Sequence, residues 1–297
     1  MSEKTDKNLG KTFKTLRESK DIPSKQVVSD NFSYPQIMKF EKGDSSISVE
    51  KLFSGLSSIN LSLEEFQYAY NEISDTNDNN LSDKIVRAFH RGNTSELESI
   101  LREIQKKTKL FPEQKSYKLI QIEIKTILQE MGEKSYKLTK GEIAALTNHL
   151  QIIKEWSYFE IWLFVNCVTV LDNKRLENLV GRLMHSSRNY LETEKNRQLT
   201  NLAALNVASV FINSDYLEPV PAYFKYVDEH IKSDFQLYEK VDLTYLKALF
   251  NYKKKPKDPE ATEAVYSCVK AMEFFQAFDT AKQMKVEFEA MRTKSQI

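Results

Sequence analysis

Three polar side chains, Tyr34, Gln36 and Lys39, occupy the first turns of a predicted helix. A Gln carboxamide can pair with adenine, a Lys ammonium can donate to guanine, and a Tyr hydroxyl can reach a phosphate. A helix that enters the major groove of DNA presents this chemistry from its N-terminal turns. The three side chains therefore predict a DNA-reading helix.

The helix that carries them has clear start and stop signals. Ser33 is a favourable N-cap, Pro35 fits the first turn, and Gly43 favours a helix end. Ile37 and Phe40 recur at helical spacing on the other side and predict the buried face. We therefore expect the polar residues to face away from the core.

The surrounding segment is basic, although the whole chain has a net charge of only +1. Residues 4–42 hold nine basic and five acidic side chains. Any nucleic-acid contact must therefore come from a local patch. A solvated surface face remains the alternative for each lysine. The expected DNA-binding residues are Lys14, Ser24, Gln26, Ser33, Tyr34, Gln36, Lys39 and Lys42.

A second group of polar side chains lies far along the chain. Asn166 and Asn206 sit inside apolar runs that are predicted to be helical, where Asn is not a favoured residue. A carboxamide donates and accepts, so it could hold the backbone of a bound peptide. It could equally satisfy a neighbouring helix or a buried water. With their neighbours, the expected peptide-binding residues are Tyr158, Phe159, Trp162, Asn166, Thr169, Asn206, Asn213 and Tyr245.

Short helices separated by polar breaks must position the first group of residues. Five are expected within residues 8–70: one containing Phe13, one from Ser24 to Ser29 with Val27 and Val28 inward, one from Ser33 to Gly43, one after Ser48 and one after Ser62. Residues 71–80, NEISDTNDNN, nearly lack hydrophobic side chains and predict a linker.

The chain from residue 81 onward has an almost wholly helical pattern. The candidate helices span 81–90, 94–108, 114–131, 140–154, 157–172, 174–191, 195–213, 217–232, 235–252, 260–277 and 279–293. Short connections between helices of this length favour stacked helical hairpins. We therefore expect an all-α fold: a helix-turn-helix DNA-binding domain at 1–70, a linker at 71–80 and an α-solenoid of tetratricopeptide-like hairpins at 81–297, which senses a ligand and dimerises.

The composition supports helices and argues against several protein classes. Only 7 Gly and 7 Pro are present, fewer than a sheet-rich fold needs. Cys167 and Cys268 are too far apart in sequence for a typical zinc motif and are expected to be free thiols, so no metal or cofactor is predicted. The N-terminus lacks the apolar core of a signal peptide, and no apolar run could span a membrane. We therefore expect a cytoplasmic protein without membrane contact.

Motifs of common enzyme classes are missing from the sequence. The four His residues lack HExxH spacing, and the chain has neither a Gly-rich phosphate loop nor a G-x-S-x-G motif. An enzyme is therefore not predicted.

Residues 9–53 resemble the five-helix DNA-binding domain of phage-repressor type. The resemblance rests on the LR pair at Leu16–Arg17, the S-x-Q at Ser24 and Gln26, and the I-x-x-F-E-K-G that ends at Gly43. It implies an internal salt bridge between Arg17 and Glu41 that joins the first and third helices.

Nearly the whole chain resembles the Rgg/GadR/MutR transcriptional regulators of Firmicutes. Besides the helix-turn-helix, the segments EWSYFEIWLFVNC (155–167) and YEKVDLTYLKALF (238–250) carry the resemblance. It implies a homodimer that binds an inverted-repeat promoter site in double-stranded DNA. It also implies a receptor domain for a short hydrophobic signalling peptide, as in quorum sensing.

Two departures from that family pattern affect the expected ligand. Some members carry a Cys in the segment that is DSSISVE (44–50) here, so this chain cannot form their intersubunit disulfide at that place. Some members carry an Arg about one turn after the helical Asn, where this chain has Thr169. A clamp for an acidic side chain or a C-terminal carboxylate is therefore not expected at this position. The expected ligand is a neutral peptide or a different kind of molecule. A regulator without a peptide ligand and a helical-repeat scaffold remain the alternative functions.

Overall fold

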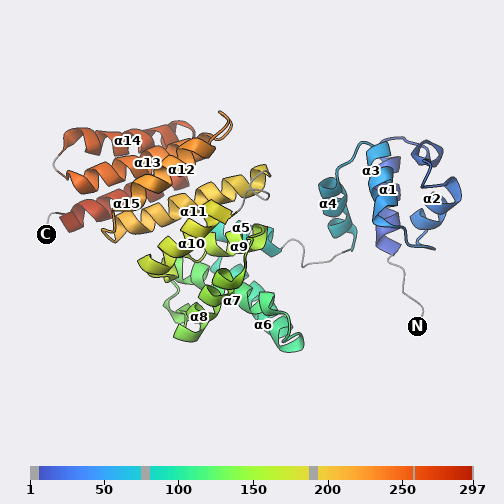
Figure 1. Ribbon diagram of the computed structural model, residues 1–297, viewed down its shortest axis with the longest axis horizontal. Coiled ribbons are helices and arrows are strands. Elements are labelled where there is room, and N and C mark those ends of the chain that lie inside the picture. The colour runs from blue at the N-terminus through green and yellow to red at the C-terminus, as the bar shows by residue number, and fades with distance from the viewer. Residues whose placement is uncertain (1–6, 75–80, 187–192, 257, 296–297) are drawn as a thin grey trace. The chain divides into compact units, whose positions relative to one another are not determined.

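The computed structural model describes residues 7–74, 81–186, 193–256 and 258–295. The described chain is helical and contains no strand, only an isolated β-bridge between Ser29 and Phe32. It divides into two compact units, residues 1–90 and 91–297. Figure 1 labels the helices of both. The all-α architecture expected from the sequence is confirmed.

The N-terminal unit is a bundle of short helices. Its elements are α1 (Lys7–Glu18), the 3-10 helix η1 (Ser24–Val27), α2 (Tyr34–Glu41), α3 (Val49–Ser58), α4 (Leu63–Ser74) and α5 (Leu81–His90). Helix α1 packs against α2 and α4, and η1 packs against α2 and α3. Phe13, Phe32 and Ile37 are completely buried at the centre of this packing. The core therefore joins α1 and α2 through the loop that carries Phe32.

The second helix is shorter than the sequence predicts. It is a single 3-10 turn that ends at Val27, and the expected continuation to Ser29 is wrong. Val27 is buried as expected, but Val28 is 46% exposed and has extended backbone angles. The β-bridge from Ser29 to Phe32 holds the following residues extended, so the helix cannot continue.

The fourth α-helix runs into the segment that was expected to be a linker. Helix α4 continues to Ser74, and Asn71 is buried. Phe66 and Ile73 are seven residues apart, about two helical turns, and therefore lie on the same face of the helix. The rest of the expected linker, residues 75–80, lies outside the described residues. The division into units also places α5 with the first unit, so the domain boundary stays a prediction.

The second unit, which we call the sensor unit after the role expected from the sequence, is an array of helical hairpins. It contains α6 (Thr94–Leu110), α7 (Lys115–Glu130), η2 (Lys134–Tyr136), α8 (Lys140–Ile152), α9 (Tyr158–Val165), η3 (Val168–Val170), α10 (Asn173–Ser186), α11 (Glu194–Asn213), α12 (Val220–His230), α13 (Leu237–Lys254), α14 (Pro259–Phe274) and α15 (Phe278–Ser295). None of the described helices is long and apolar enough to cross a bilayer.

Helix α11 is the centre of the sensor unit. It packs against α9, α10, α12 and α13, while α13 continues the array through α14 and α15 (Figure 1). Its small buried residues, Ala203, Ala204 and Ala208, allow neighbouring helices to approach closely. One continuous apolar core runs from α7 to α15. Side chains on α11 therefore lie between two parts of the array.

The predicted helix 157–172 is interrupted, which corrects the expected placement of its polar residues. Helix α9 ends at Val165, Asn166 is its C-cap, and Thr169 lies in the separate turn η3. Asn166 is therefore not in the middle of a helix, and Thr169 does not continue the face of Phe159 and Trp162. Asn is well suited to a helix end, where its side chain can bond local backbone groups.

Candidate functional site

Local capping fixes the helix that carries the predicted DNA-reading residues. The carboxamide oxygen of Gln36 accepts a hydrogen bond from the Ser33 N–H at 3.1 Å, as in a capping box. At the other end Gly43 has a φ of +75°, and its N–H donates to the Phe40 carbonyl. This left-handed position ends the helix. The start and stop signals in the sequence are confirmed.

The predicted DNA-binding residues are accessible. Tyr34, Gln36 and Lys39 are exposed on α2, and the opposite side of the helix is buried. Ser33 and Lys42 at its ends and Gln26 in η1 are exposed as well, whereas Ser24 is half-buried. Since the capping bond occupies the oxygen of Gln36, only its NH2 group is free to donate in this conformation. Pairing with adenine through both groups requires this oxygen either to accept a second hydrogen bond or to release the first.

Two lysines of the basic segment have partners within the protein. Lys14 lies 3.8 Å from the Glu18 carboxylate, and both side chains are half exposed. The Lys20 ammonium donates to the carbonyls of Ile59 and Asn60 at 3.0 and 2.9 Å, where it caps the end of α3. Lys20 therefore stabilises the fold, and its charge does not add to the free basic surface of the segment.

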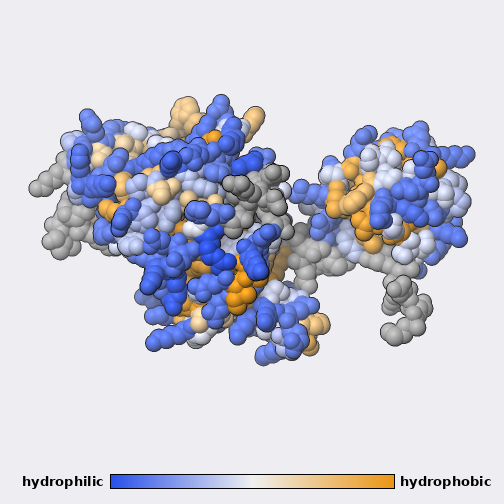
Figure 2. Space-filling model, viewed as in Figure 1, coloured by the Kyte–Doolittle hydropathy of each residue, from blue (hydrophilic) through white to orange (hydrophobic). Residues whose placement is uncertain are grey.

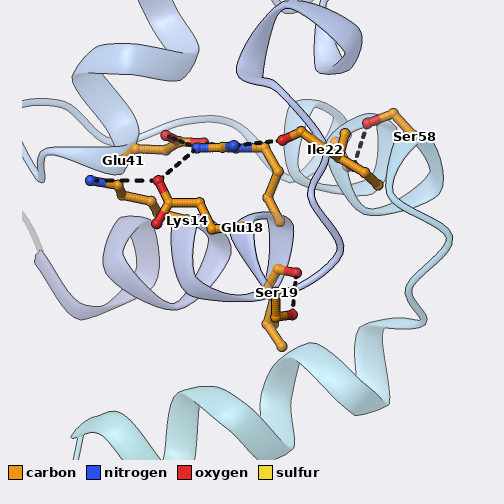
Figure 3. A network of polar contacts seen from close by, with 9 residues as sticks. Lys14, Glu18, Ser19, Ile22, Glu41 and Ser58 are labelled. Carbon is orange, nitrogen blue, oxygen red and sulfur yellow. Dashed lines mark hydrogen bonds and ion pairs between the residues drawn. The ribbon is translucent and has the colours of Figure 1, made fainter.

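A buried ion pair joins α1 to α2, as the resemblance implied. The Arg17 guanidinium donates to both oxygens of Glu41, through Nε at 2.7 Å and Nη2 at 2.8 Å (Figure 3). It also donates to the Ile22 carbonyl at 2.6 Å. The hydrogen bonds to Glu41 raise the pKa of Arg17 above its ordinary value despite burial. The pair fixes the orientation of α2 against α1.

A close backbone approach at Gly10 was not anticipated from the sequence. A Cβ atom added at Gly10 would lie 1.7 Å from the Phe40 carbonyl oxygen. Glycine is therefore required where α1 crosses α2. The segment KNLGKTF gives no local sign of this contact, because the partner lies thirty residues further along.

In the sensor unit, Asn166 and Trp162 bind a buried carboxylate. The Trp162 Nε1–H donates to Glu123 at 2.7 Å, and the Asn166 amide donates to the same oxygen at 3.1 Å. Glu123 is only 1% exposed. Burial raises the pKa of Glu123 to about 7, although these two hydrogen bonds oppose the rise. Both predicted peptide-binding residues thus have a structural partner.

Asn206 retains more hydrogen-bonding capacity than Asn166. It is half-buried in the middle of α11, and its NH2 group reaches the Val165 carbonyl at 3.4 Å. Within the described part of the chain this single long bond is its only one. Thr169 donates to Glu130, and Asn213 donates to Glu287 at 2.7 Å. Of the polar residues predicted to bind peptide, Asn206 therefore keeps the most hydrogen-bonding capacity for a ligand.

The predicted aromatic residues do not form one surface. Tyr158 stacks on Trp162 with centroids 6.1 Å apart, and Phe159 packs against the core. Tyr245 is 2% exposed, and its hydroxyl donates to the Met284 carbonyl and to Glu287. Tyr245 is thus a core residue, since α14 and α15 cover the side of α13 from which it projects.

A cavity of about 360 Å³ opens between α9, α11 and α13. Of the predicted peptide-binding residues, only Tyr158 lines it. The lining consists of Tyr158, Lys195, Gln198, Leu199, Leu202, Leu205, Tyr238, Glu239 and Asp242. Leu202, Tyr238 and Asp242 lie on helix faces that are visible in the sequence, but only the packing of α11 against both neighbours brings those faces together.

A polar cluster lies behind the cavity. Glu287 accepts hydrogen bonds from Asn213 at 2.7 Å, Tyr245 at 2.9 Å and Ser209 at 3.2 Å. Burial and the charge of Glu287 raise the pKa of Asp242 to about 7. No group of His, Cys, Asp or Glu suited to a metal ion occurs among the described residues. The carboxylates here therefore do not converge on a metal position.

Solved structures of similar fold cover almost the whole chain. The chain is similar to the SHP pheromone receptor Rgg2 of Streptococcus dysgalactiae, with 20% identity, coverage of 95% and 99% of the two chains and a TM-score of 0.78. A protein of Listeria monocytogenes EGD-e matches with 15% identity, 98% and 99% coverage and a TM-score of 0.81. PrgX in its complex with cCF10 matches with 13% identity, 97% and 94% coverage and a TM-score of 0.73.

A family model identifies the sensor unit directly from its sequence. The model of the C-terminal domain of the HTH-type transcriptional regulator Rgg matches residues 98–290, which is more than half of the chain. The match spans α6 to α15 and includes every residue that lines the cavity. The protein therefore belongs to the Rgg family of HTH-type transcriptional regulators.

Proposed function

We propose that the protein is a homodimeric, sequence-specific DNA-binding regulator that responds to a short signalling peptide. The observation that supports DNA binding best is the exposed polar side of α2, fixed to α1 by the Arg17–Glu41 pair. An orientation held by a buried bidentate pair suits a helix that must present side chains to base edges.

Dimerisation is supported by apolar surface on the N-terminal unit. Figure 2 shows hydrophobic residues gathered on one side of this unit, and Val49 and Phe53 of α3 are 61% and 50% exposed. Surfaces of this kind often mark protein–protein contacts. A dimer would present two copies of α2 to half-sites about one helical turn apart. Footprinting should reveal an inverted repeat, and a single unrepeated half-site would contradict the dimer.

The DNA-binding part is tested by variants of α2. Gln36→Ala combined with Lys39→Ala should abolish binding to the promoter site in a gel-shift titration, because both removed groups face the groove. Gln67→Ala on the exposed side of α4 is the matched control and should bind normally. Binding should weaken steeply with salt, since lysine–phosphate contacts release counterions. Full binding by the double variant would contradict α2 as the reading helix.

The peptide part is supported by the cavity and by the matched relatives. Rgg2 of Streptococcus dysgalactiae is a pheromone receptor, and PrgX has been solved with cCF10. The cavity has three leucines and two tyrosines in its lining, which suits apolar peptide side chains. Addition of synthetic hydrophobic heptapeptides should change the DNA affinity of the full chain if the sensor unit binds them.

A regulator without a peptide ligand is the second candidate function. It is favoured by the partners that Asn166, Thr169 and Asn213 already have within the protein. In that case, no heptapeptide would bind to the full chain, and its DNA affinity would not change with any of them.

A further inference from the structure

The cavity between α9, α11 and α13 has an uneven distribution of charge. Its lining contains two carboxylates, Glu239 and Asp242, and one cation, Lys195. The Lys195 ammonium lies over the Tyr158 ring, 4.5 Å from its centroid, on the α9 side of the cavity. The carboxylates project from α13. The cavity therefore has a cationic side and an acidic side.

Asp242 is the cavity carboxylate whose charge is least balanced by cations or hydrogen bonds. Its side chain is half-buried, yet in the part of the chain that the structure describes no cation pairs with it and no hydrogen bond reaches it. The groups that face it are Tyr238 and Glu239 on α13, Lys195 on α11, Tyr158 on α9 and Glu287 on α15. A carboxylate that is partly withdrawn from water and has no partner costs stability, so its presence needs another reason.

Glu287 strengthens the negative potential at Asp242. Its oxygens accept hydrogen bonds from three neutral groups, the side chains of Ser209, Asn213 and Tyr245. These bonds hold the carboxylate in place without neutralising it. Within the described residues no Lys or Arg forms an ion pair with Glu287. Two acidic groups thus act together on one end of the cavity.

We propose that this cavity binds the positively charged group of a peptide, an N-terminal ammonium or a Lys or Arg side chain, which pairs with Asp242. The inference rests on the proposed peptide-sensing function and specifies the chemistry of its ligand. Leu199, Leu202 and Leu205 would contact the apolar part of the same residue. A volume of about 360 Å³ fits one or two residues, so the cavity binds one charged end of the peptide.

The energetics of Asp242 agree with this assignment. Burial and the charge of Glu287 raise the pKa of Asp242 to about 7 in the free protein. A bound cation would offset both causes and favour the ionised carboxylate. A charged pair in such a partly enclosed place is stronger than the same pair in water. The site therefore discriminates between cationic and neutral ligands.

The test uses pools of synthetic heptapeptides with random apolar residues and amidated C-termini. One pool has a free N-terminus and one Lys, and a second is N-acetylated and keeps the Lys. A third has a free N-terminus and norleucine in place of Lys, and a fourth is N-acetylated with norleucine and thus neutral. The full chain is incubated with each pool, and bound peptides are quantified by mass spectrometry. At least one cationic pool should be retained about tenfold better than the neutral pool. The second and third pools identify which cation binds.

Two variants test whether Asp242 causes the preference for cationic peptides. Asp242→Asn keeps the shape of the side chain and should reduce retention of the cationic pool to that of the neutral pool. Asp228→Asn is the matched control, because this exposed carboxylate pairs with Lys247 outside the cavity, and the preference should remain. Circular dichroism should show that both variants are folded.

Three results would overturn the inference. Equal retention of the neutral and cationic pools would show that the cavity does not recognise charge, while peptide sensing itself would stand. An unchanged preference in Asp242→Asn would place the cation elsewhere. Failure of all four pools to bind would overturn the proposed peptide function, and this inference with it.

Discussion

The two units differ in whether a cation pairs with the carboxylates that are withdrawn from water. In the N-terminal unit, Arg17 and Glu41 neutralise each other through two short hydrogen bonds. In the sensor unit, Glu123 is buried and Asp242 is half-buried, and among the described residues no cation pairs with either of them. Loss of contact with water raises the pKa of each to about 7. A neutralised pair holds two helices in one orientation. A carboxylate without a cation costs stability and is most useful where something else must bind.

The largest expected effect comes from breaking the neutralised pair. Glu41→Ala leaves Arg17 buried without its partner and should destabilise the N-terminal unit by roughly 3–5 kcal/mol. Denaturant unfolding, followed separately in the two units by hydrogen exchange, measures the loss. Lys14→Ala is the control, since the exposed Lys14–Glu18 pair should contribute less than about 1 kcal/mol and Glu18 stays beside Arg17. Equal losses in the two variants would contradict a special role for the buried pair.

A smaller effect is expected from pH in the sensor unit. Glu123 keeps a proton in the folded state up to about pH 7, whereas the carboxyl in the unfolded chain loses it near the ordinary pKa of 4.5. The folded state thus binds more protons between these values, so stability falls as pH rises through this range and levels off above about 7. Asp242 acts in the same direction, because its pKa rises from an ordinary value of 3.8 to about 7 on folding.

Thermal unfolding at several pH values between about 5 and 8 tests this dependence. Glu123→Gln and Asp242→Asn should each make the stability of the sensor unit less dependent on pH. Asp242→Asn should also raise the melting temperature on the alkaline side, because it removes a charge beside Glu287. A sensor unit that becomes more stable as pH rises would contradict uncompensated burial of these groups.

The smallest expected effects on stability distinguish Asn166 from Asn206. Asn166→Ala removes a donor from buried Glu123 and should cost about 1–3 kcal/mol. Asn206→Ala removes one long hydrogen bond and should cost less than about 1 kcal/mol. If Asn206 holds a peptide backbone, its loss should lower peptide affinity about tenfold while ligand-free DNA binding stays intact. Equal destabilisation by both variants would assign Asn206 to the fold.

Local signals in the sequence determined most of the helices. Ser33 and Gly43 mark the start and the end of the third predicted helix, which is α2, by capping interactions that act within a few residues. The structure confirms both helix ends. The span 81–90 was predicted from its apolar spacing and matches α5. The interruption after Val165 was not predicted, because FVNCV is apolar enough to continue a helix and Asn166 reveals its role only through Glu123.

Only the tertiary structure decided where charges and cavities lie. Arg17 and Glu41 could be paired in advance through a known motif, whereas nothing local connects Asp242 with Glu287, 45 positions further along the chain. Their proximity depends on how α13 packs in the array with α14 and α15. Likewise Gly10 meets the Phe40 carbonyl only because α1 crosses α2 closely. Periodicity and capping specify each helix, but the crossing of helices depends on side-chain packing between distant segments, which a single sequence does not encode locally.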